Sequence, residues 1–203
     1  MIILDFGSAL SCQNSKPMVK RMIDALADVD AGNNRIVIKW QLFKSAPPNV
    51  PLKHGIFSYA YKYAASKGYE TTASVFDLES LTQLQKYTVP FVKLACNSKL
   101  YYLRGIATQP VIVSHPSSES IWADYPDDYM CCLSEYPAQA EEYIKRFTNE
   151  DLKHGISDHT AGWWLYKNFE PEIYEKHYVL EHDESNPDAG PFACTPEELK
   201  EIL

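Results

Sequence analysis

The sequence alternates short runs rich in β-branched and aromatic residues with runs of helical periodicity, and this alternation constrains the fold most strongly. Strands that alternate with helices are typical of a parallel α/β fold, and eight such units match a (β/α)8 barrel. At 203 residues the chain lies near the lower limit of that fold. We therefore expect one domain over residues 1–203, a minimal (β/α)8 TIM barrel with shortened helices. The predicted strands are residues 2–7, 35–41, 71–76, 91–96, 110–114, 129–136, 155–160 and 175–178.

The predicted helices between these strands are mostly short. The clearest covers residues 15–29, where Met18, Met22, Leu26 and Val29 form one apolar stripe at helical spacing. An open doubly wound sheet is the alternative fold, although no Gly-x-Gly-x-x-Gly motif follows a strand to support its dinucleotide-binding version. The other predicted helices are residues 57–66, 77–87, 100–106, 117–122, 138–147, 161–169 and 195–203.

Composition narrows the classes of partner. A formal net charge of −8 argues against a nucleic-acid binder that relies on bulk positive charge. No apolar run is long enough to span a bilayer, and the initial apolar residues lead directly into Asp5 without the pattern of a signal peptide. The five cysteines lack the spacing of a disulfide framework, which favours reduced thiols. We therefore expect a cytoplasmic protein with neither nucleic-acid nor membrane partners.

Polar side chains gather at the predicted carboxyl ends of the strands, where a barrel of this kind carries its active site. Nearly every strand contributes one, which scattered loop residues would explain less easily. The residues are Asp5, Lys39, Gln41, Ser74, Lys93, Ser114, Ser134, Tyr136, Ser157, His159 and His177.

The last two predicted strands carry the residues best suited to a metal ion. Alternate residues of a strand share a face, so Ser157 and His159 point the same way, as do Glu175 and His177. Neighbouring parallel strands would bring the two imidazoles to one end of the sheet, an arrangement that suits a divalent metal with open positions for water or substrate. Two hydrogen-bonded structural histidines are the alternative.

Two lysines occur within apolar runs, where an unpaired ammonium group would be costly. Lys39 and Lys93 therefore either form internal ion pairs, with Asp5 or Glu175 as partners, or bind the phosphate or carboxylate of a ligand. Gln41 shares a strand face with Lys39 and would hydrogen-bond the same ligand or a second one.

The hydroxyl residues are less specific. Ser74 and Ser114 on their own suit caps of turns or helices as well as a ligand site. Tyr136 suits either a wall of the site or simple packing before the next helix. Asp188 lies in Asn-Pro-Asp, a composition typical of turns.

Several motifs in combination resemble the barrel domain of the N-acetylneuraminate (sialic acid) synthase family, and the likeness runs through most of the chain. They are Gly-Ile-Ser-Asp-His-Thr at residues 155–160, Glu-Lys-His-Tyr at 175–178, Lys-x-Gln at 39–41, Phe-Val-Lys at 91–93 and Cys-x-Ser-x-Tyr-Pro at 132–137.

This resemblance implies condensation of phosphoenolpyruvate with an N-acetylmannosamine-like aldose, giving a nonulosonic (sialic-type) 2-keto acid and phosphate. It also implies a divalent metal, Mn²⁺ or Mg²⁺, held by His159 and His177 and acting as a Lewis acid on the aldehyde oxygen of the acceptor. Asp5 would complete the catalytic set. The substrate-binding residues that the resemblance implies are Lys39, Gln41, Ser74, Lys93, Ser114, Ser134, Tyr136, Ser157 and Asp188.

The chain also departs from the family pattern. Asp5 stands where the family has a glutamate followed by Gly-x-Asn-His, and Cys96 stands where it has a serine after the fourth strand. A thiol is a poorer hydrogen-bond donor to phosphate than a hydroxyl. The small C-terminal antifreeze-like domain of the family, which contacts the sugar, does not follow, so we expect a shortened member. The phosphoenolpyruvate half of the site is therefore better supported than the sugar half.

Two other functions remain open. One is a degenerate barrel that binds a phosphorylated or acidic ligand without turnover. The other is a metal-dependent aldolase or epimerase that uses the same two histidines. The barrel surface that short helices leave exposed is a candidate interface for a homo-oligomer.

Overall fold

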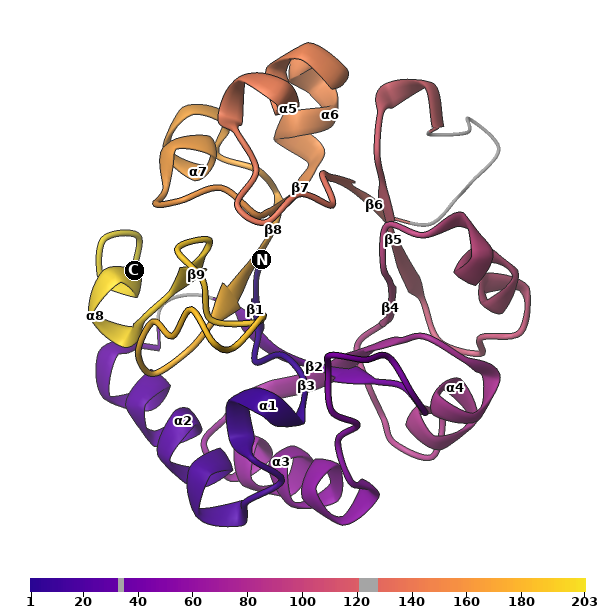
Figure 1. Ribbon diagram of the computed structural model, residues 1–203, viewed down its shortest axis with the longest axis vertical. Helices are drawn as coiled ribbons and strands as arrows, with labels where there is room; N and C mark the ends of the chain where they lie inside the picture. The colour runs from indigo at the N-terminus through magenta and orange to yellow at the C-terminus, as the bar shows by residue number, and fades with distance from the viewer. Residues whose placement is uncertain (33–34, 121–127) are drawn as a thin grey trace.

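Eight parallel strands close into a barrel in the computed structural model, which describes residues 1–32, 35–120 and 128–203 (Figure 1). Each strand pairs with the next along the chain, and β8 pairs with β1, where Asp5 lies opposite His177. This closure confirms the predicted (β/α)8 TIM barrel and excludes the open sheet. The strands are β1 (Ile2–Asp5), β2 (Ile36–Leu42), β3 (Glu70–Val75), β4 (Val92–Leu94), β5 (Val111–His115), β6 (Asp128–Cys132), β7 (Gly155–Asp158) and β8 (Ile173–Tyr178), with a short β9 (Ala193–Cys194) beside β8.

The helices surround the barrel and are short, as predicted (Figure 1). In the described part of the chain, only α2 and α3 exceed eight residues. The α-helices are α1 (Ala9–Cys12), α2 (Lys16–Val29), α3 (His54–Ser66), α4 (Leu78–Leu84), α5 (Ala140–Arg146), α6 (Asn149–His154), α7 (Trp164–Phe169) and α8 (Pro196–Leu199), and the 3-10 helices are η1 (Ser98–Gly105) and η2 (Ser118–Ser120).

Near the sixth strand, one prediction was wrong and one helix was missed. The strand was expected to reach Tyr136 but ends at Cys132, because the backbone N–H of Leu133 donates to the Tyr143 hydroxyl at 3.4 Å instead of continuing the sheet. Helix α6 was not predicted. It starts at a capping box in which the side chains of Thr148 and Asp151 each accept a hydrogen bond from the other residue's backbone N–H.

Smaller differences concern the other element bounds. Helix α1 and strand β9 were not predicted, and the expected helix at residues 100–106 is the 3-10 helix η1. The expected helix at residues 161–169 begins only at Trp164, and the last helix stops at Leu199. Of the expected helix at 117–122, η2 is described, whereas residues 121–122 lie outside the described residues.

Side chains inside the barrel form two layers. Because alternate residues of a strand share a face, each strand that contributes an apolar residue to the lower layer contributes a polar residue, or in one case a cysteine, two positions later. The lower layer closes the amino-terminal end, and the upper layer faces the carboxyl ends. The lower layer is Ile3, Val37, Phe91, Ile112, Met130 and Ile173. The residues two positions later are Asp5, Lys39, Lys93, Ser114, Cys132 and Glu175.

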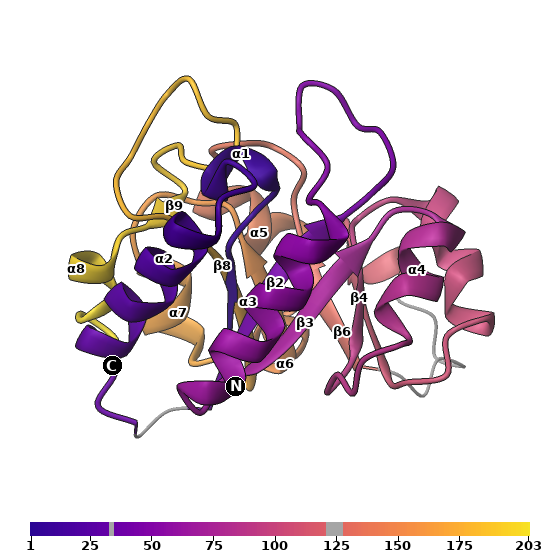
Figure 2. The same cartoon turned by 90° about the horizontal axis from the view of Figure 1, so that it is seen from below.

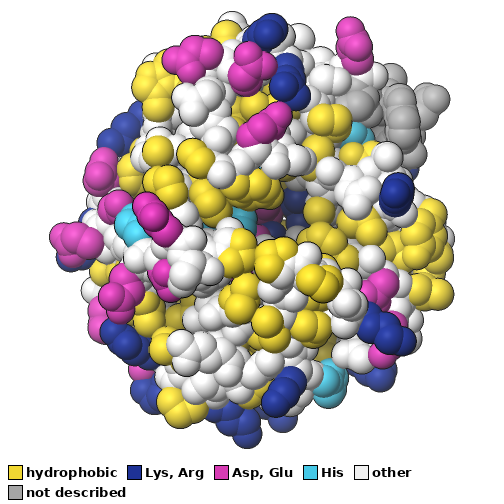
Figure 3. All heavy atoms as spheres, viewed as in Figure 1, with side chains coloured by type: hydrophobic (Ala, Val, Ile, Leu, Met, Phe, Trp, Pro, Cys, Tyr) yellow, Lys and Arg dark blue, Asp and Glu magenta, His cyan; other side chains and the backbone are white. Residues whose placement is uncertain are grey.

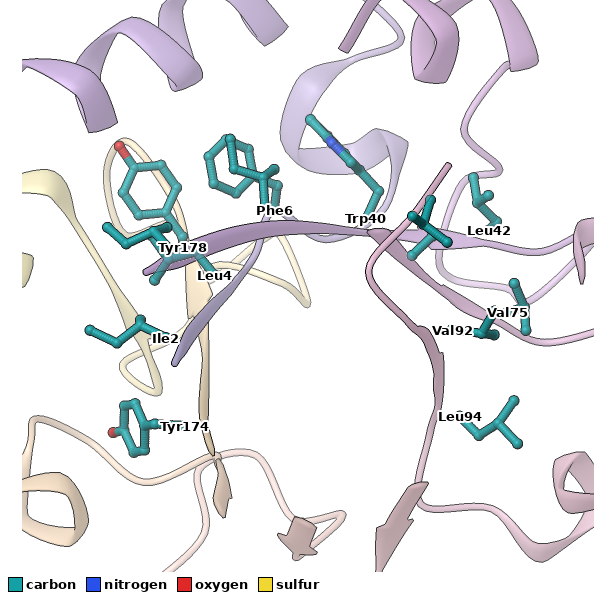
Figure 4. Close-up of a cluster of buried hydrophobic side chains, with 14 of the residues drawn as sticks. Ile2, Leu4, Phe6, Trp40, Leu42, Val75, Val92, Leu94, Tyr174 and Tyr178 are labelled. Carbon is teal, nitrogen blue, oxygen red and sulfur yellow. The ribbon is translucent and has the colours of Figure 1, made fainter. Parts of the chain in front are cut away.

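The outward faces of the strands carry the larger hydrophobic core, under the helices (Figure 4). Phe6 belongs to this core and lies beside β1 and β2. Its ring stacks on Tyr178 with centroids 4.6 Å apart and meets Trp40 edge-on at 5.3 Å. These contacts join β1, β2 and β8 on their outward side, while their inward faces stay available for polar residues.

The carboxyl ends of the strands open on one side of the molecule. Figure 2 shows the loops after β2 and after β8 rising furthest on that side. Within the described residues, no helix is both long enough and apolar enough to cross a bilayer.

Candidate active site

The carboxyl ends of the strands surround a cavity of about 670 Å³. Figure 3 shows a hollow at the centre of this face, bordered by hydrophobic side chains. The structure places every predicted site residue on the lining of the cavity, although what they bind stays a prediction. These residues are Asp5, Lys39, Gln41, Ser74, Lys93, Ser114, Ser134, Tyr136, Ser157, His159, His177 and Asp188.

Lys39 lies at the centre of the floor and is fully paired. Its Nζ donates to Asp5 Oδ2 at 2.7 Å and to Ser74 Oγ at 2.9 Å, and it lies 3.6 Å from Glu175 Oε1. Gln41 Nε2 donates to the same oxygen of Asp5 at 3.0 Å. The internal ion pair considered for Lys39 is therefore present, and it fixes the position of the Asp5 carboxylate.

Lys93 and its partners form a second cluster of polar side chains beside that of Lys39. Its Nζ donates to Ser114 Oγ at 2.6 Å and lies 3.9 Å from Glu175 Oε1. Ser157 Oγ donates to that same carboxylate oxygen at 2.9 Å. Glu175 therefore lies between the two lysines, while its buried Oε2 has no hydrogen-bond partner among the described residues.

Glu175 was not predicted as a site residue, only as a candidate partner for a lysine. The signal was present in the sequence, because Glu175 shares a strand face with His177. Its position between Lys39 and Lys93 depends on how the strands pair around the barrel, which one strand alone does not reveal.

The buried charges hold one another in their ionised forms. Burial alone would raise the pKa of Asp5, but the charge of Lys39, the neighbouring His177 ring, and hydrogen bonds from Lys39 and Gln41 hold it below its usual range. Burial likewise opposes ionisation of Glu175, but Lys39 and Lys93 lower its pKa. For Lys39, burial favours the neutral form, and Asp5 and Glu175 outweigh it and raise the pKa. We therefore treat all three as charged at neutral pH.

The two histidines meet at one edge of the cavity, with ring centroids 5.6 Å apart. Nδ1 of His159 bonds to the carbonyl oxygen of Leu133. A carbonyl oxygen only accepts, so Nδ1 carries the proton and Nε2 keeps its lone pair. Burial lowers the pKa of His159 below its ordinary value, which favours this neutral form.

One ring nitrogen of His177 is available to a ligand. Its Nε2 lies 3.7 Å from Asp5 Oδ2, whereas its buried Nδ1 lies 4.0 Å from Asp188 Oδ1 and has no hydrogen-bond partner within the described ranges. No group of three or more His, Cys, Asp or Glu side chains in those ranges is arranged to hold a metal. Two imidazoles with water would fit a divalent ion, since a fixed Nε2 lone pair and an unpartnered ring nitrogen are present.

Asp188 belongs to the cavity and is buried, although its local sequence is typical of a turn. Its Oδ2 accepts hydrogen bonds from the backbone N–H and the hydroxyl of Ser8, at 2.8 and 2.9 Å. The loop after β8 is therefore attached to the loop after β1. Ser8 was not predicted as a site residue, because nothing in a single serine indicates a partner 180 positions away.

Aromatic side chains form one wall of the cavity mouth. The ring of Tyr136, 52% exposed, lies 4.1 Å from that of His159, and Phe192 lies 5.1 Å from both Tyr136 and His177. Ser134 lies on the same rim and is exposed. Phe192 was not predicted as a site residue, because it lies in a long loop without periodicity.

The fold and the cavity define a (β/α)8 barrel with buried charges and two histidines at the carboxyl ends of its strands. No protein-family model matches the chain, and no curated protein matches it by sequence. Solved structures do match. One is the N-acetylneuraminic acid (sialic acid) synthetase of Leptospira borgpetersenii in complex with citrate, with a TM-score of 0.75 at 22% identity. The match covers 98% of this chain and 80% of that one.

Two proteins of spore coat polysaccharide biosynthesis are similar as well. Protein E from Chromobacterium violaceum has a TM-score of 0.77 at 16% identity, covering 98% of this chain and 71% of that one. Protein spsE from Bacillus subtilis has a TM-score of 0.71 at 19% identity, covering 99% and 65%. At these identities the likeness establishes a shared fold. It supports the predicted resemblance at the level of the barrel.

Proposed function

We propose that this protein condenses phosphoenolpyruvate with an aldose, N-acetylmannosamine-like, in a metal-dependent reaction that gives a nonulosonic (sialic-type) 2-keto acid and phosphate. The observation that carries the proposal is the gathering of two buried lysines, their hydroxyl partners and two imidazoles in one cavity. The fold shared with a sialic acid synthetase supports it. The arrangement supplies cations for an acidic substrate and imidazoles for a metal ion.

The lysine side of the cavity is the proposed site for phosphoenolpyruvate. Lys93 with Ser114, and Lys39 with Ser74, each place an ammonium group beside a hydroxyl. Phosphate or carboxylate oxygens would accept charge-assisted hydrogen bonds from the ammonium groups and ordinary ones from the hydroxyls. Ser157 keeps Glu175 in place between the lysines, so the two cations stay apart in fixed positions.

The charge of the cavity supports a requirement for a divalent cation. The described lining contains two lysines against the four carboxylates of Asp5, Glu175, Glu184 and Asp188, a negative surplus that disfavours an anionic substrate. His159 and His177 would hold such an ion. When bound, it would neutralise this surplus and act as a Lewis acid on the aldehyde oxygen.

In the proposed reaction, the methylene carbon of phosphoenolpyruvate bonds to the aldehyde carbon, and water adds to the former enol carbon. The proton that this water gives up balances the one that the aldehyde oxygen takes to become a hydroxyl. The C–O bond to phosphate then breaks, phosphate leaves, and the former enol carbon becomes the ketone. Asp5 is ionised and fixed by Lys39, so it is placed to accept a hydrogen bond from that water and to orient it. Asp188 would accept a hydrogen bond from a sugar hydroxyl, and Tyr136 would pack against the sugar ring.

Binding without turnover is the second candidate, and one observation favours it. Lys39 is already paired with Asp5 at 2.7 Å, and Lys93 lies near Glu175, so part of the positive charge that a substrate would use is neutralised within the protein. Release of phosphate from phosphoenolpyruvate in the presence of an acceptor separates a synthase from such a binding protein. It also separates a synthase from an aldolase or epimerase.

The proposed function is tested by calorimetric titration of phosphoenolpyruvate into the manganese-loaded protein. We expect binding that requires Mn²⁺, that the double variant His159→Ala/His177→Ala loses, and that His154→Ala retains. His154 ends α6, outside the lining of the cavity, and is therefore a matched control. No binding to the wild-type protein would remove the synthase interpretation. Equal binding with and without Mn²⁺ would mean that phosphoenolpyruvate binding does not require the metal.

A further inference from the structure

Two cysteines meet on the Lys93 side of the cavity. Cys96 follows β4 and Cys132 ends β6, and both line the cavity. The Sγ of Cys96 donates to the carbonyl oxygen of Cys132 at 3.6 Å. Cys96 is half-buried, whereas Cys132 is 4% exposed. The remaining cysteines, Cys12, Cys131 and Cys194, belong to the hydrophobic core outside the barrel.

The two thiols differ in acidity in a way that suits them to different roles. The neighbouring Cys132 side chain lowers the pKa of Cys96 to about 7, against the opposing effect of burial and with help from Ser134 and Lys93. The neighbouring Cys96 side chain, together with burial, raises the pKa of Cys132. Cys96 is therefore partly a thiolate at neutral pH, and the thiolate is the reactive form of cysteine.

We propose that Cys96 and Cys132 form a hydroperoxide-reactive dithiol site that closes into a disulfide across the Lys93 side of the cavity. The Cys96 thiolate attacks the peroxide oxygen, the O–O bond breaks, and a sulfenic acid forms as hydroxide leaves. The Cys132 sulfur then attacks the Cys96 sulfur and the S–O bond breaks. The departing hydroxide and the Cys132 proton give water. The two sulfurs supply the two electrons that reduce the peroxide.

The consequence of this oxidation, unlike the site itself, rests on the proposed function. A disulfide between the ends of β4 and β6 would lie beside Lys93 and Ser114, where we place an anionic group of phosphoenolpyruvate. It would narrow that side of the cavity and join the segments that follow β4 and end β6 by a covalent bond. Oxidised protein should therefore bind phosphoenolpyruvate at least about tenfold more weakly than reduced protein.

The site is tested by treating the full chain with hydrogen peroxide, blocking free thiols by alkylation and mapping tryptic peptides by mass spectrometry. Cleavage after Lys93 and Lys99 isolates Cys96 in the peptide 94–99, apart from both Cys131 and Cys132. We expect this peptide to be linked to the one that contains Cys132, and dithiothreitol to release it. The link should persist in Cys131→Ala and be absent from Cys96→Ser and Cys132→Ser.

Three results would overturn the site: an unreacted Cys96, a Cys96 that proceeds to sulfinic acid without forming the link, or a link that disappears in Cys131→Ala. Circular dichroism of each variant excludes misfolding as the cause. Peptide mapping needs no substrate, so its outcome is independent of the proposed function. Phosphoenolpyruvate titration of the reduced protein tests the function separately. Equal affinity of reduced and oxidised wild type would overturn the inhibitory consequence alone.

Discussion

Gly7 lies between two carboxylates of the cavity, those of Asp5 and Asp188. Its backbone N–H donates to Asp5 Oδ1 at 2.9 Å, and its φ of +72° turns the chain so that Ser8 reaches Asp188. A side chain at this position would meet Asp188 directly, with an added Cβ 2.6 Å from Oδ2 and 2.9 Å from Cβ of that residue. Glycine is therefore required here for two reasons, the left-handed backbone and the close approach.

We expect Gly7→Ala to lower the free energy of unfolding more than Gly68→Ala does, which is the matched control. Gly68 has a φ of +90° but no atom within 4 Å of an added Cβ, so its variant reports only the backbone cost, about 1–2 kcal/mol. The clash with Asp188 should add about 1–3 kcal/mol. Urea unfolding measures both. Equal losses would mean that Asp188 moves aside without cost.

Among the secondary-structure elements, α6 depends on one carboxylate. Asp151 accepts hydrogen bonds from the backbone N–H and hydroxyl of Thr148, from Tyr129 of β6 at 3.0 Å, and from Ser118 of η2. It therefore fixes the start of α6 to the end of the barrel that lies opposite the cavity.

Asp151→Ala should lower the free energy of unfolding by about 1–2 kcal/mol, because it removes the Asp151 half of the capping box and leaves a tyrosine and a serine without their acceptor. Glu150→Ala, one residue earlier on the exposed side, is the control and should change it by less than about 0.5 kcal/mol. Thermal or urea unfolding compares the two. A loss no larger than that of the control would show that α6 is held by packing alone.

The sequence predicts elements whose signal is local and periodic. The stripe of α2 and the eight strand runs identified a barrel, because each needs only nearby residues. Helix α6 was missed because its start depends on Thr148 and Asp151 bonding each other, and the pattern was interpreted as the end of α5. The end of β6 was missed because Tyr143, ten residues along the chain, provides the acceptor that replaces the sheet.

For the site, the sequence identified many of the lining residues and the acidic partners of the two lysines, but not the other contacts among them. Alternation along a strand places Lys39, Lys93, His159 and His177 inside the barrel, and closure brings them together. Ser8, Glu175 and Phe192 were missed as site residues. Ser8 contacts a loop from the opposite end of the chain, and Phe192 lies in a loop without periodicity. No local pattern specifies contacts of either kind.

Across the whole molecule, the buried charges join strands that are far apart in sequence. Asp5 and Glu175 stand on the adjacent strands β1 and β8, and Lys39 on β2 contacts both. Removing one charge would leave another buried without a partner, which is costly. The same ion pairs therefore position the candidate site and support closure of the barrel between its first and last strands.

This arrangement predicts how stability depends on pH. The pKa values of Asp5 and Glu175 are lowered in the folded protein, so in acid the unfolded chain binds protons that the folded protein does not. Their contribution should be complete above the unfolded values, about 3.9 and 4.3, and be lost progressively as pH falls below them. Urea unfolding at pH 7 and pH 3 measures this loss. The variant Asp5→Asn/Glu175→Gln should be less stable at pH 7, where Lys39 lacks its partners, yet lose less on acidification. If the variant loses as much stability between pH 7 and pH 3 as the wild-type protein does, the acid sensitivity comes from surface carboxylates instead.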